Sequence, residues 1–308
     1  MNSNDLSKKS LRKFFDKNAF YFMMLPAIIL IFVFQYIPKF GLILAFKNYR
    51  YDLGIFGSEW VGLDNFKSFF QTPDAWLITR NTILYNLVFI FLNTFLSVAL
   101  AIGLNELRGK YSRKIYQTVM IMPHFLSYVI VSYLVFSLLS TESGLVNKSI
   151  LPFLGIDPIN WYGEPKYWPF ILTFVNMWKV VGYNSIVYLA AIVGIDTSLY
   201  EAAQIDGANK FQQIKFVTIP GIKTMISIML IMAFGGIFNS NFGLFYQVPM
   251  NSGLLKSTTA VLGTYIYNSM SDVGFSTAAG FYVSIVGFVM ILITNTIAKK
   301  ISEESSLF

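Results

Sequence analysis

Six apolar runs, each long enough to cross a bilayer, recur along the chain. A bilayer core of about 30 Å requires about 20 helical residues. Only 13% of the 308 residues are charged and 55% are hydrophobic, whereas about a quarter of a soluble domain is charged. We therefore expect an all-α integral membrane domain over 20–298, with a cytoplasmic N-terminal tail over 1–19 and a cytoplasmic C-terminal tail over 299–308. The six predicted spans are 20–37, 82–104, 115–139, 168–193, 223–245 and 276–298.

The basic residues that flank these runs predict how the chain lies in the membrane. If the N-terminus is cytoplasmic, the segments on that side hold about twice as many lysine and arginine residues as the external segments. Cytoplasmic loops of membrane proteins are enriched in these residues. We therefore expect a multi-pass protein of the cell (plasma) membrane with both termini inside. The net charge of +7 is interpreted as a sign of this topology and not of nucleic-acid binding.

The N-terminal apolar run is interpreted as the first span and not as a cleaved signal, because LPAIILIFVFQYIP is long and lacks a small-residue cleavage site. The external loop that follows is rich in Trp and Phe, which favour the headgroup zone. Within it we expect a short helix over 65–71. This helix should end before Pro73, because the residue before a proline disfavours the helical conformation. The absence of cysteine excludes disulfides and thiolate metal sites.

The stretch EAAQIDGANKFQQIKFVTIP, residues 201–220, is a polar segment between the fourth and fifth runs, and the orientation above places it in the cytoplasm. Ser198 and Glu201 fit a capping box at the start of a helix, with Asp196 as an alternative cap. Gly207 should end this helix, because glycine accepts the left-handed conformation there. A second helix is expected from Ala208 to about residue 216. The segment 196–220 is thus predicted to form a hairpin of two helices.

The spacing of this segment resembles the signature loop of binding-protein-dependent ABC importer permeases. The matching residues are Glu201, Ala202, Ala203, Gly207, Val217, Ile219 and Pro220, and Asp206-Gly207-Ala208 matches the form found in sugar importers. IPKFGLILAFKNY, WVGLDNFKSFF, NTILYNL and MWKVVGYNSIVYLAAIVGID extend the resemblance to the branch that imports complex oligosaccharides. The departures are small, with Ile219 in place of the usual Leu and Thr197 where proline is frequent.

The resemblance implies a type I ABC importer permease fold with six transmembrane helices. It implies that the hairpin docks on a separate cytoplasmic ATPase, and that a second related permease, two ATPase subunits and an extracellular sugar-binding protein, lipid-anchored or soluble, complete the importer. ATP and Mg would belong to the ATPases, so the chain would be neither an enzyme nor a holder of cofactors. Its own closest approach to a phosphate-binding loop, GLNELRGKYS, has the wrong glycine spacing. The coupling residues would be Glu201, Ala202, Ala203, Asp206, Gly207, Ala208 and Pro220.

Polar residues inside the apolar runs are the candidates for a substrate path. Asn176, Lys179 and Tyr183 fall within about 80° of one another on one helix face. A lysine at mid-membrane costs about 2.5 to 3.5 kcal/mol, so it should meet water or a partner. The alternatives are a lysine that snorkels or pairs with another subunit, and amides that bond neighbouring helices. The candidate path residues are Asn86, Asn93, Asn176, Lys179, Tyr183 and Asn239.

The remaining features do not point to catalysis. His124 is interpreted as a core residue, and the sequence shows no cluster of metal ligands and no nucleophilic triad. Gly235 and Gly236 predict a close-packed or interrupted fifth span. Two other functions remain open, an ABC permease for another solute such as peptides and an ion-coupled secondary carrier. The carrier is disfavoured because such carriers usually keep intramembrane carboxylates, and here the acidic residues are nearly confined to loops and termini.

Overall fold

The computed structural model describes residues 17–107 and 109–301, and this part of the chain is mostly helical. Most of the predicted tails, 1–16 and 302–308, and Arg108 lie outside the described residues. The longer helices are α2 (Ala19–Ile31), α5 (Pro73–Glu106), α6 (Lys110–Ile121), α7 (Tyr128–Leu139), α9 (Trp168–Val193), α13 (Lys223–Gly235) and α16 (Val273–Ile301).

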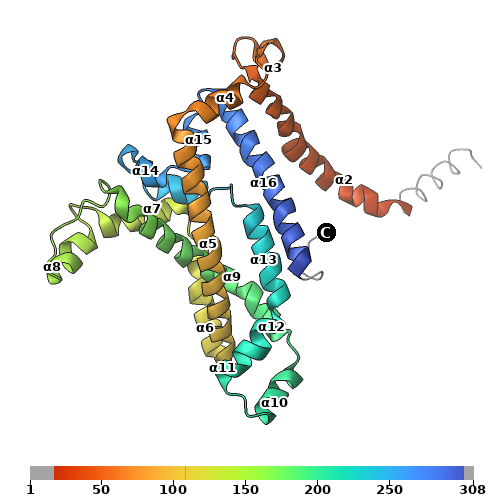
Figure 1. The fold of residues 1–308 in the computed structure, drawn as a ribbon, viewed down its shortest axis with the longest axis vertical. Helices are drawn as coiled ribbons and strands as arrows, with labels where there is room; N and C mark the ends of the chain where they lie inside the picture. The colour runs from red at the N-terminus through yellow and green to blue at the C-terminus, as the bar shows by residue number, and fades with distance from the viewer. Residues whose placement is uncertain (1–16, 108, 302–308) are drawn as a thin grey trace, which may run out of the picture.

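Shorter elements connect these helices. They are α3 (Gly54–Gly57), α4 (Asp64–Gln71), α8 (Leu151–Phe153), α10 (Thr197–Ile205), α11 (Lys210–Gln213), α12 (Ile219–Gly221), α14 (Lys256–Thr259) and α15 (Leu262–Asn268), with an antiparallel pair β1 (Lys47–Asn48) and β2 (Glu59–Trp60). Figure 1 shows α10 and α11 at one end and α3 and α4 at the other.

Four stretches form continuous helices that are long and apolar enough to span a membrane. Two further candidates are pairs of helices that are sharply bent, by 97° between Tyr111–Phe125 and Tyr128–Leu139 and by 59° between Lys210–Gly221 and Lys223–Gly235. The chain therefore has up to six spans if each bent pair counts as one. The four continuous stretches are Ala19–Phe46, Pro73–Glu106, Pro165–Val193 and Val273–Thr296.

The first span is longer than the predicted 20–37, because the helix continues beyond Pro38 to Phe46. A π-helical turn over Phe32–Tyr36 leads into a 3₁₀ segment over Ile37–Phe46, and Pro38 lies in the first turn of that segment. The 3₁₀ segment packs on α16 and α4. Figure 1 shows α2 leaning away from the other helices, and its most apolar stretch buries no residue in this chain.

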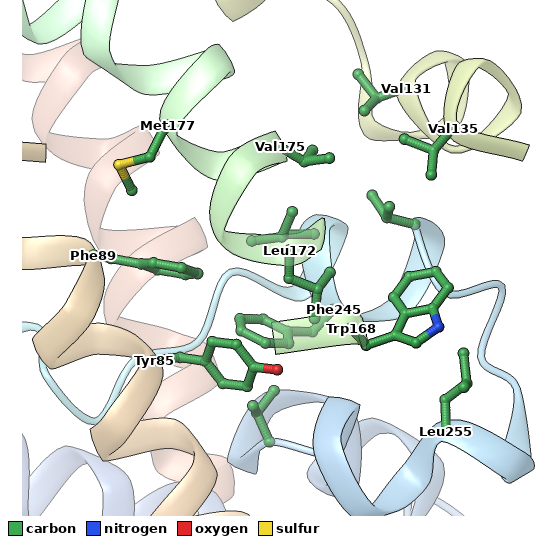
Figure 2. Close-up of a cluster of buried hydrophobic side chains, with 13 residues drawn as sticks. Tyr85, Phe89, Val131, Val135, Trp168, Leu172, Val175, Met177, Phe245 and Leu255 are labelled. Atoms are coloured by element: carbon green, nitrogen blue, oxygen red, sulfur yellow. The ribbon is translucent and has the colours of Figure 1, made fainter. Parts of the chain in front are cut away.

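The helices α5 and α9 cross and carry much of the core. A cluster of buried side chains joins them to α7 and to the segment after α13 (Figure 2). Close approach is possible where residues are small, as expected for membrane helices. On α9, a Cβ at Gly182 would stand 1.9 Å from the carbonyl oxygen of Met120, so this glycine lets α6 and α9 touch. The labelled members of the cluster are Tyr85, Phe89, Val131, Val135, Trp168, Leu172, Val175, Met177, Phe245 and Leu255.

Two of the predicted spans are not straight helices. In the third, a 3₁₀ turn over Met122–Phe125 follows α6, Leu126 is extended, and Ser127 caps α7 by accepting a hydrogen bond from the Ile130 amide. In the fifth, α13 ends at Gly235, which confirms the predicted interruption. The predicted span 223–245 is therefore not one continuous helix. A Cβ at Gly235 would meet the Ile291 side chain of α16 at 2.5 Å, so this glycine lets α13 pack closely on α16.

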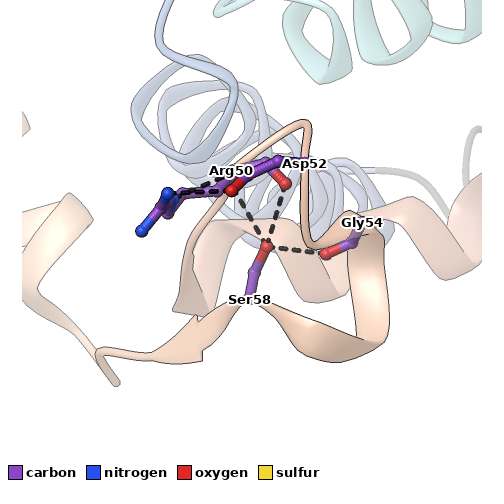
Figure 3. A network of polar contacts seen from close by, with 4 residues as sticks. All are labelled: Arg50, Asp52, Gly54 and Ser58. Carbon is purple, nitrogen blue, oxygen red and sulfur yellow. Dashed lines mark hydrogen bonds and ion pairs between the residues drawn. The ribbon is translucent and has the colours of Figure 1, made fainter.

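The loop between the first and second spans is held together by hydrogen bonds. The helix expected over 65–71 is confirmed as α4, which ends before Pro73. Lys47 is buried, and its ammonium donates to the carbonyls of Ile55, Phe56 and Ser58. Figure 3 shows Ser58 bonded to the backbone of the turn that follows Arg50. Because these bonds satisfy the backbone of the loop, it holds its shape without a disulfide.

Candidate functional site

The polar segment between α9 and α13 folds as the predicted hairpin, with a different cap. The Asp196 carboxylate accepts a hydrogen bond from the Ser198 amide at 2.9 Å, and this bond lowers the pKa of the Asp196 carboxyl. The capping box predicted from Ser198 and Glu201 is therefore wrong. Helix α10 begins at Thr197, two residues before the start that a cap at Ser198 would give, and Asp196, the alternative cap, is confirmed.

The turn at Gly207 is confirmed. Gly207 has φ +79°, and nothing lies within 4 Å of the position that a Cβ would take. The Ala208 amide donates to the Ala203 carbonyl at 2.8 Å and the Gly207 amide donates to the Gln204 carbonyl at 3.0 Å. This pair of bonds is the Schellman motif, which requires a left-handed residue at the position of Gly207. The turn is thus rigid and specified by glycine.

The second helix of the hairpin starts later than expected. Asn209 and Gln212 form a reciprocal capping box, with bonds of 2.7 and 3.0 Å, so the helix begins at Lys210 and not at Ala208. It continues through a π-helical turn to Gly221, with Pro220 in its last turn. The correction follows from local chemistry, because Asn at the cap and Gln three residues later satisfy two free amides at once.

Most of the predicted coupling residues of the hairpin are exposed. The hairpin is also bonded to the rest of the chain. Glu201, Ala202, Asp206, Gly207 and Pro220 are exposed, whereas Ala203 and Ala208 are half-buried. One ion pair ties the hairpin to α5, and one hydrogen bond joins the two helices within it. Lys210 pairs with Glu106 at the end of α5 at 3.0 Å, and the Tyr200 hydroxyl bonds to the Thr218 hydroxyl at 2.9 Å.

A polar cavity of about 380 Å³ lies between α5, α9 and the break of the fifth span. Asn86 defines one wall, because its amide donates to the carbonyls of Ile237 and Asn239 at 2.8 and 3.0 Å and so holds the unwound segment against α5. The Oδ1 atom of Asn93 is buried and has no hydrogen-bond partner among the described residues. The polar lining consists of Asn86, Asn93, Thr94, Asn176, Asn184, Tyr188, Asn239, Ser240 and Asn241.

Four of the six candidate path residues line this cavity, namely Asn86, Asn93, Asn176 and Asn239. The list of candidate path residues leaves out Asn184 and Asn241, which also line the cavity. Asn184 lies eight residues after Asn176, which puts it within about 80° on the same helix face, so helical spacing could have found it. Asn241 follows the break of the fifth span, where helical spacing no longer applies.

Lys179 and Tyr183 do not line the cavity. Lys179 is only 3% exposed, and its ammonium donates to the carbonyls of Pro123 and His124 at 3.0 and 3.3 Å and to that of Leu126. The ring of Tyr183 stacks on His124 with 4.1 Å between the centroids. His124 is thus a half-buried residue with a packed ring, close to its interpretation as a core residue. The geometry favours a structural role for Lys179 and Tyr183.

Comparison with known proteins finds relatives over most of the chain. Residues 93–303 match the family described as binding-protein-dependent transport system inner membrane component. The polygalacturonan/rhamnogalacturonan transport system permease protein YteP of Bacillus subtilis (strain 168) is 34% identical over 300 residues, 96% of this chain and 92% of that protein. The lactose transport system permease protein LacF of Rhizobium radiobacter is 33% identical over 266 residues, 85% and 86% of the two chains.

Solved structures share the fold over nearly the same length. A chain of a bacterial ABC transporter involved in the import of the acidic polysaccharide alginate superposes with a TM-score of 0.85 at 33% identity, covering 95% of this chain and 99% of that one. A second structure, of a bacterial alginate ABC transporter in complex with alginate pentasaccharide-bound periplasmic protein, gives 0.84 at 33% identity, covering 94% and 98%.

Proposed function

Because the chain belongs to the family of binding-protein-dependent transport system inner membrane components, we propose that it forms, with a second permease, the path for an oligosaccharide delivered by an external binding protein. The observation that carries this proposal is the amide-lined cavity at the break of the fifth span. Irregular backbone at membrane depth is tolerated where it lines a cavity, and transporters bind substrate at such breaks.

The chemistry of the cavity suits a substrate rich in hydroxyl groups. Each asparagine amide offers two donors and an acceptor, so it can pair with a hydroxyl in either direction. Among the described residues, no Lys, Arg, Asp or Glu lines the cavity. This wall therefore recognises neutral groups of the sugar by hydrogen bonds. Asn86, Asn93, Asn176 and Asn239 are the residues to which we assign this role.

The second part of the proposal is that the hairpin couples the chain to an ATPase. Its exposed surface around Glu201, Ala202, Asp206 and Gly207 docks on a cytoplasmic ATPase, and small residues let another protein approach closely. The rigid turn at Gly207 passes a displacement on to the spans, which a loose loop would absorb. Hydrolysis of ATP, with its Mg, takes place on the partner ATPases. The chain itself conducts the sugar and catalyses no reaction.

The test is uptake by the reconstituted importer, with its second permease, ATPases and binding protein in lipid vesicles. The probes are oligogalacturonides and lactose, sugars of the two classes named for the relatives. We expect Asn93→Leu and Asn176→Leu to reduce ATP-dependent uptake at least tenfold, because each removes hydrogen-bonding groups from the cavity wall. Ser284→Leu is the control, since Ser284 is exposed on α16 away from the cavity.

Two results would contradict the proposal. One is uptake by both asparagine variants at the rate of the parent protein. The other is uptake that persists without ATP and stops when ion gradients are dissipated, because that behaviour belongs to a secondary carrier.

A further inference from the structure

The break in the third span exposes carbonyl groups that need donors. The last carbonyls of a helix have no partner within the helix, and at membrane depth water does not satisfy them. Lys179 supplies the donors from the neighbouring span, since its ammonium reaches the carbonyls of Pro123, His124 and Leu126. A lysine is well suited to the C-terminal end of a helix, where the backbone dipole is negative. The charge and the break therefore stabilise each other.

A second contact extends this arrangement toward the cavity. The Lys179 ammonium lies 4.7 Å from the centre of the Tyr128 ring, at the start of α7. The Tyr128 hydroxyl accepts a hydrogen bond from the Asn241 amide at 2.6 Å. Asn241 lines the cavity, and its Oδ1 accepts from the Leu244 amide at 3.1 Å. A Cβ at Gly243 would meet the Tyr128 ring at 2.4 Å, so this ring also packs directly on the backbone after the break of the fifth span.

The other end of α6 lies at the hairpin. There Arg113 donates to the carbonyls of Asn105 and Leu107 at 2.8 and 3.3 Å. Arg113 and the hairpin residue Lys210 line one cavity of about 550 Å³. In Figure 1, α6 runs along α5 from the hairpin end of the molecule. One helix thus joins the surroundings of the hairpin to the break that Lys179 holds.

We propose that Lys179 is a positioning residue for transport: it fixes the break of the third span and, through Tyr128, sets the place of Asn241 in the cavity wall. A displacement of the hairpin then reaches the cavity through α6 and this junction of Lys179, Tyr128 and Asn241. The inference rests on the proposed function, because it assigns to Lys179 the link between the ATPase side and the sugar path. Lys179 itself touches no sugar.

The test uses the absence of native cysteine. Ala233 lines the cavity, so Ala233→Cys gives this chain a single reporter thiol, and any cysteines of the partner subunits are replaced. In the complete importer, we measure the rate at which trimethylammonium-ethyl methanethiosulfonate labels this thiol, without nucleotide and after trapping with ATP and vanadate. The ratio of the two labelling rates measures how much the accessibility of the cavity changes when the ATPases bind and hydrolyse ATP. The experiment needs no sugar.

We expect Lys179→Met and Tyr128→Phe each to reduce this ratio at least fivefold, and the double variant to reduce it no further, because both changes break one chain of contacts. Lys179→Arg should restore most of the ratio, since it keeps charge and donors. Lys166→Met is the control, because Lys166 is exposed and pairs with Glu164. Tyr128→Phe removes only a hydroxyl, so it decides the question if Lys179→Met does not assemble.

The outcomes separate this inference from the proposed function. A large ratio in the parent that Tyr128→Phe and Lys179→Met leave within twofold would overturn the inference alone. Fivefold losses that multiply in the double variant would also overturn it, because Lys179 and Tyr128 would then act independently. A ratio near one in the parent itself would instead contradict the proposed ATP-driven function.

Discussion

At the scale of single residues, the chain uses glycine in two unrelated ways. Gly207 is needed for its backbone, with φ +79° and open space around it. Gly182 is needed for its missing side chain, because a Cβ would strike the Met120 carbonyl. The first of these roles could be predicted, since a glycine after a helical pattern is a recognised end signal. The second could not, because it depends on which helix packs against α9.

The role of Gly207 leads to a prediction. Gly207→Ala should reduce the ATP hydrolysis that sugar-loaded binding protein stimulates, because a left-handed conformation costs an ordinary residue about 1–2 kcal/mol and the hairpin would relax from its docking shape. Gly207→Asn should keep most of the activity, since asparagine tolerates this conformation. Hydrolysis by the purified importer measures both.

The control for this prediction is Gly253→Ala, at a glycine outside the hairpin that also has free space around it and no positive φ. Membrane insertion should be the same in all three variants. Full stimulation in Gly207→Ala would show that the hairpin does not need this turn.

At the scale of elements, hydropathy located the spans but not their bends. The apolar runs of the third and fifth spans look continuous in sequence. The 97° bend of the third depends on Ser127 as a cap and on Lys179, which lies 56 residues after Pro123. A pattern of local residues holds no information about such a partner. The helix α4 and the end of α10 were predictable because a proline and a glycine mark them within the sequence.

The orientation of the elements can be tested with single cysteines at exposed positions. Buried positions such as Gln213 and Asn147 are unsuitable, because the reactivity of a cysteine there would depend on side-chain packing and not on which side of the membrane it lies. We expect Ser149→Cys and Ser257→Cys to react with a membrane-impermeant maleimide on intact cells, and Lys215→Cys to react only after the cells are opened. Labelling of Lys215→Cys from outside would contradict a cytoplasmic hairpin.

At the scale of the whole molecule, part of the cavity lining could be predicted from the sequence. Asn86, Asn93 and Asn176 lie on faces that helical spacing identifies, and Asn239 follows two glycines. The assignment of Lys179 to the path relied on its cost in the membrane, which correctly required a polar partner. The partner that the structure shows is a set of backbone carbonyls, and only the fold brings these to the lysine.

The first span gives a prediction at this scale, because its most apolar stretch buries no residue in its own chain. We expect saturation mutagenesis of residues 20–31, read out as sugar uptake, to show sensitivity with a period of about 3.6 residues, since the proposed second permease would cover one face. Residues of α16 that face outward provide the comparison. Even tolerance of apolar residues around α2 would mean that lipid alone surrounds it.

The contact between Lys179 and the third span also has a consequence for biosynthesis. During synthesis, the third span enters the membrane before Lys179 has been made. Its unpaired carbonyls therefore have no donor until the fourth span follows. The fourth span in turn carries a charge whose insertion alone costs about 2.5–3.5 kcal/mol. Each segment is a poor membrane helix by itself, and each supplies what the other lacks. The two should therefore leave the insertion machinery as a pair, with their packing and their insertion a single event.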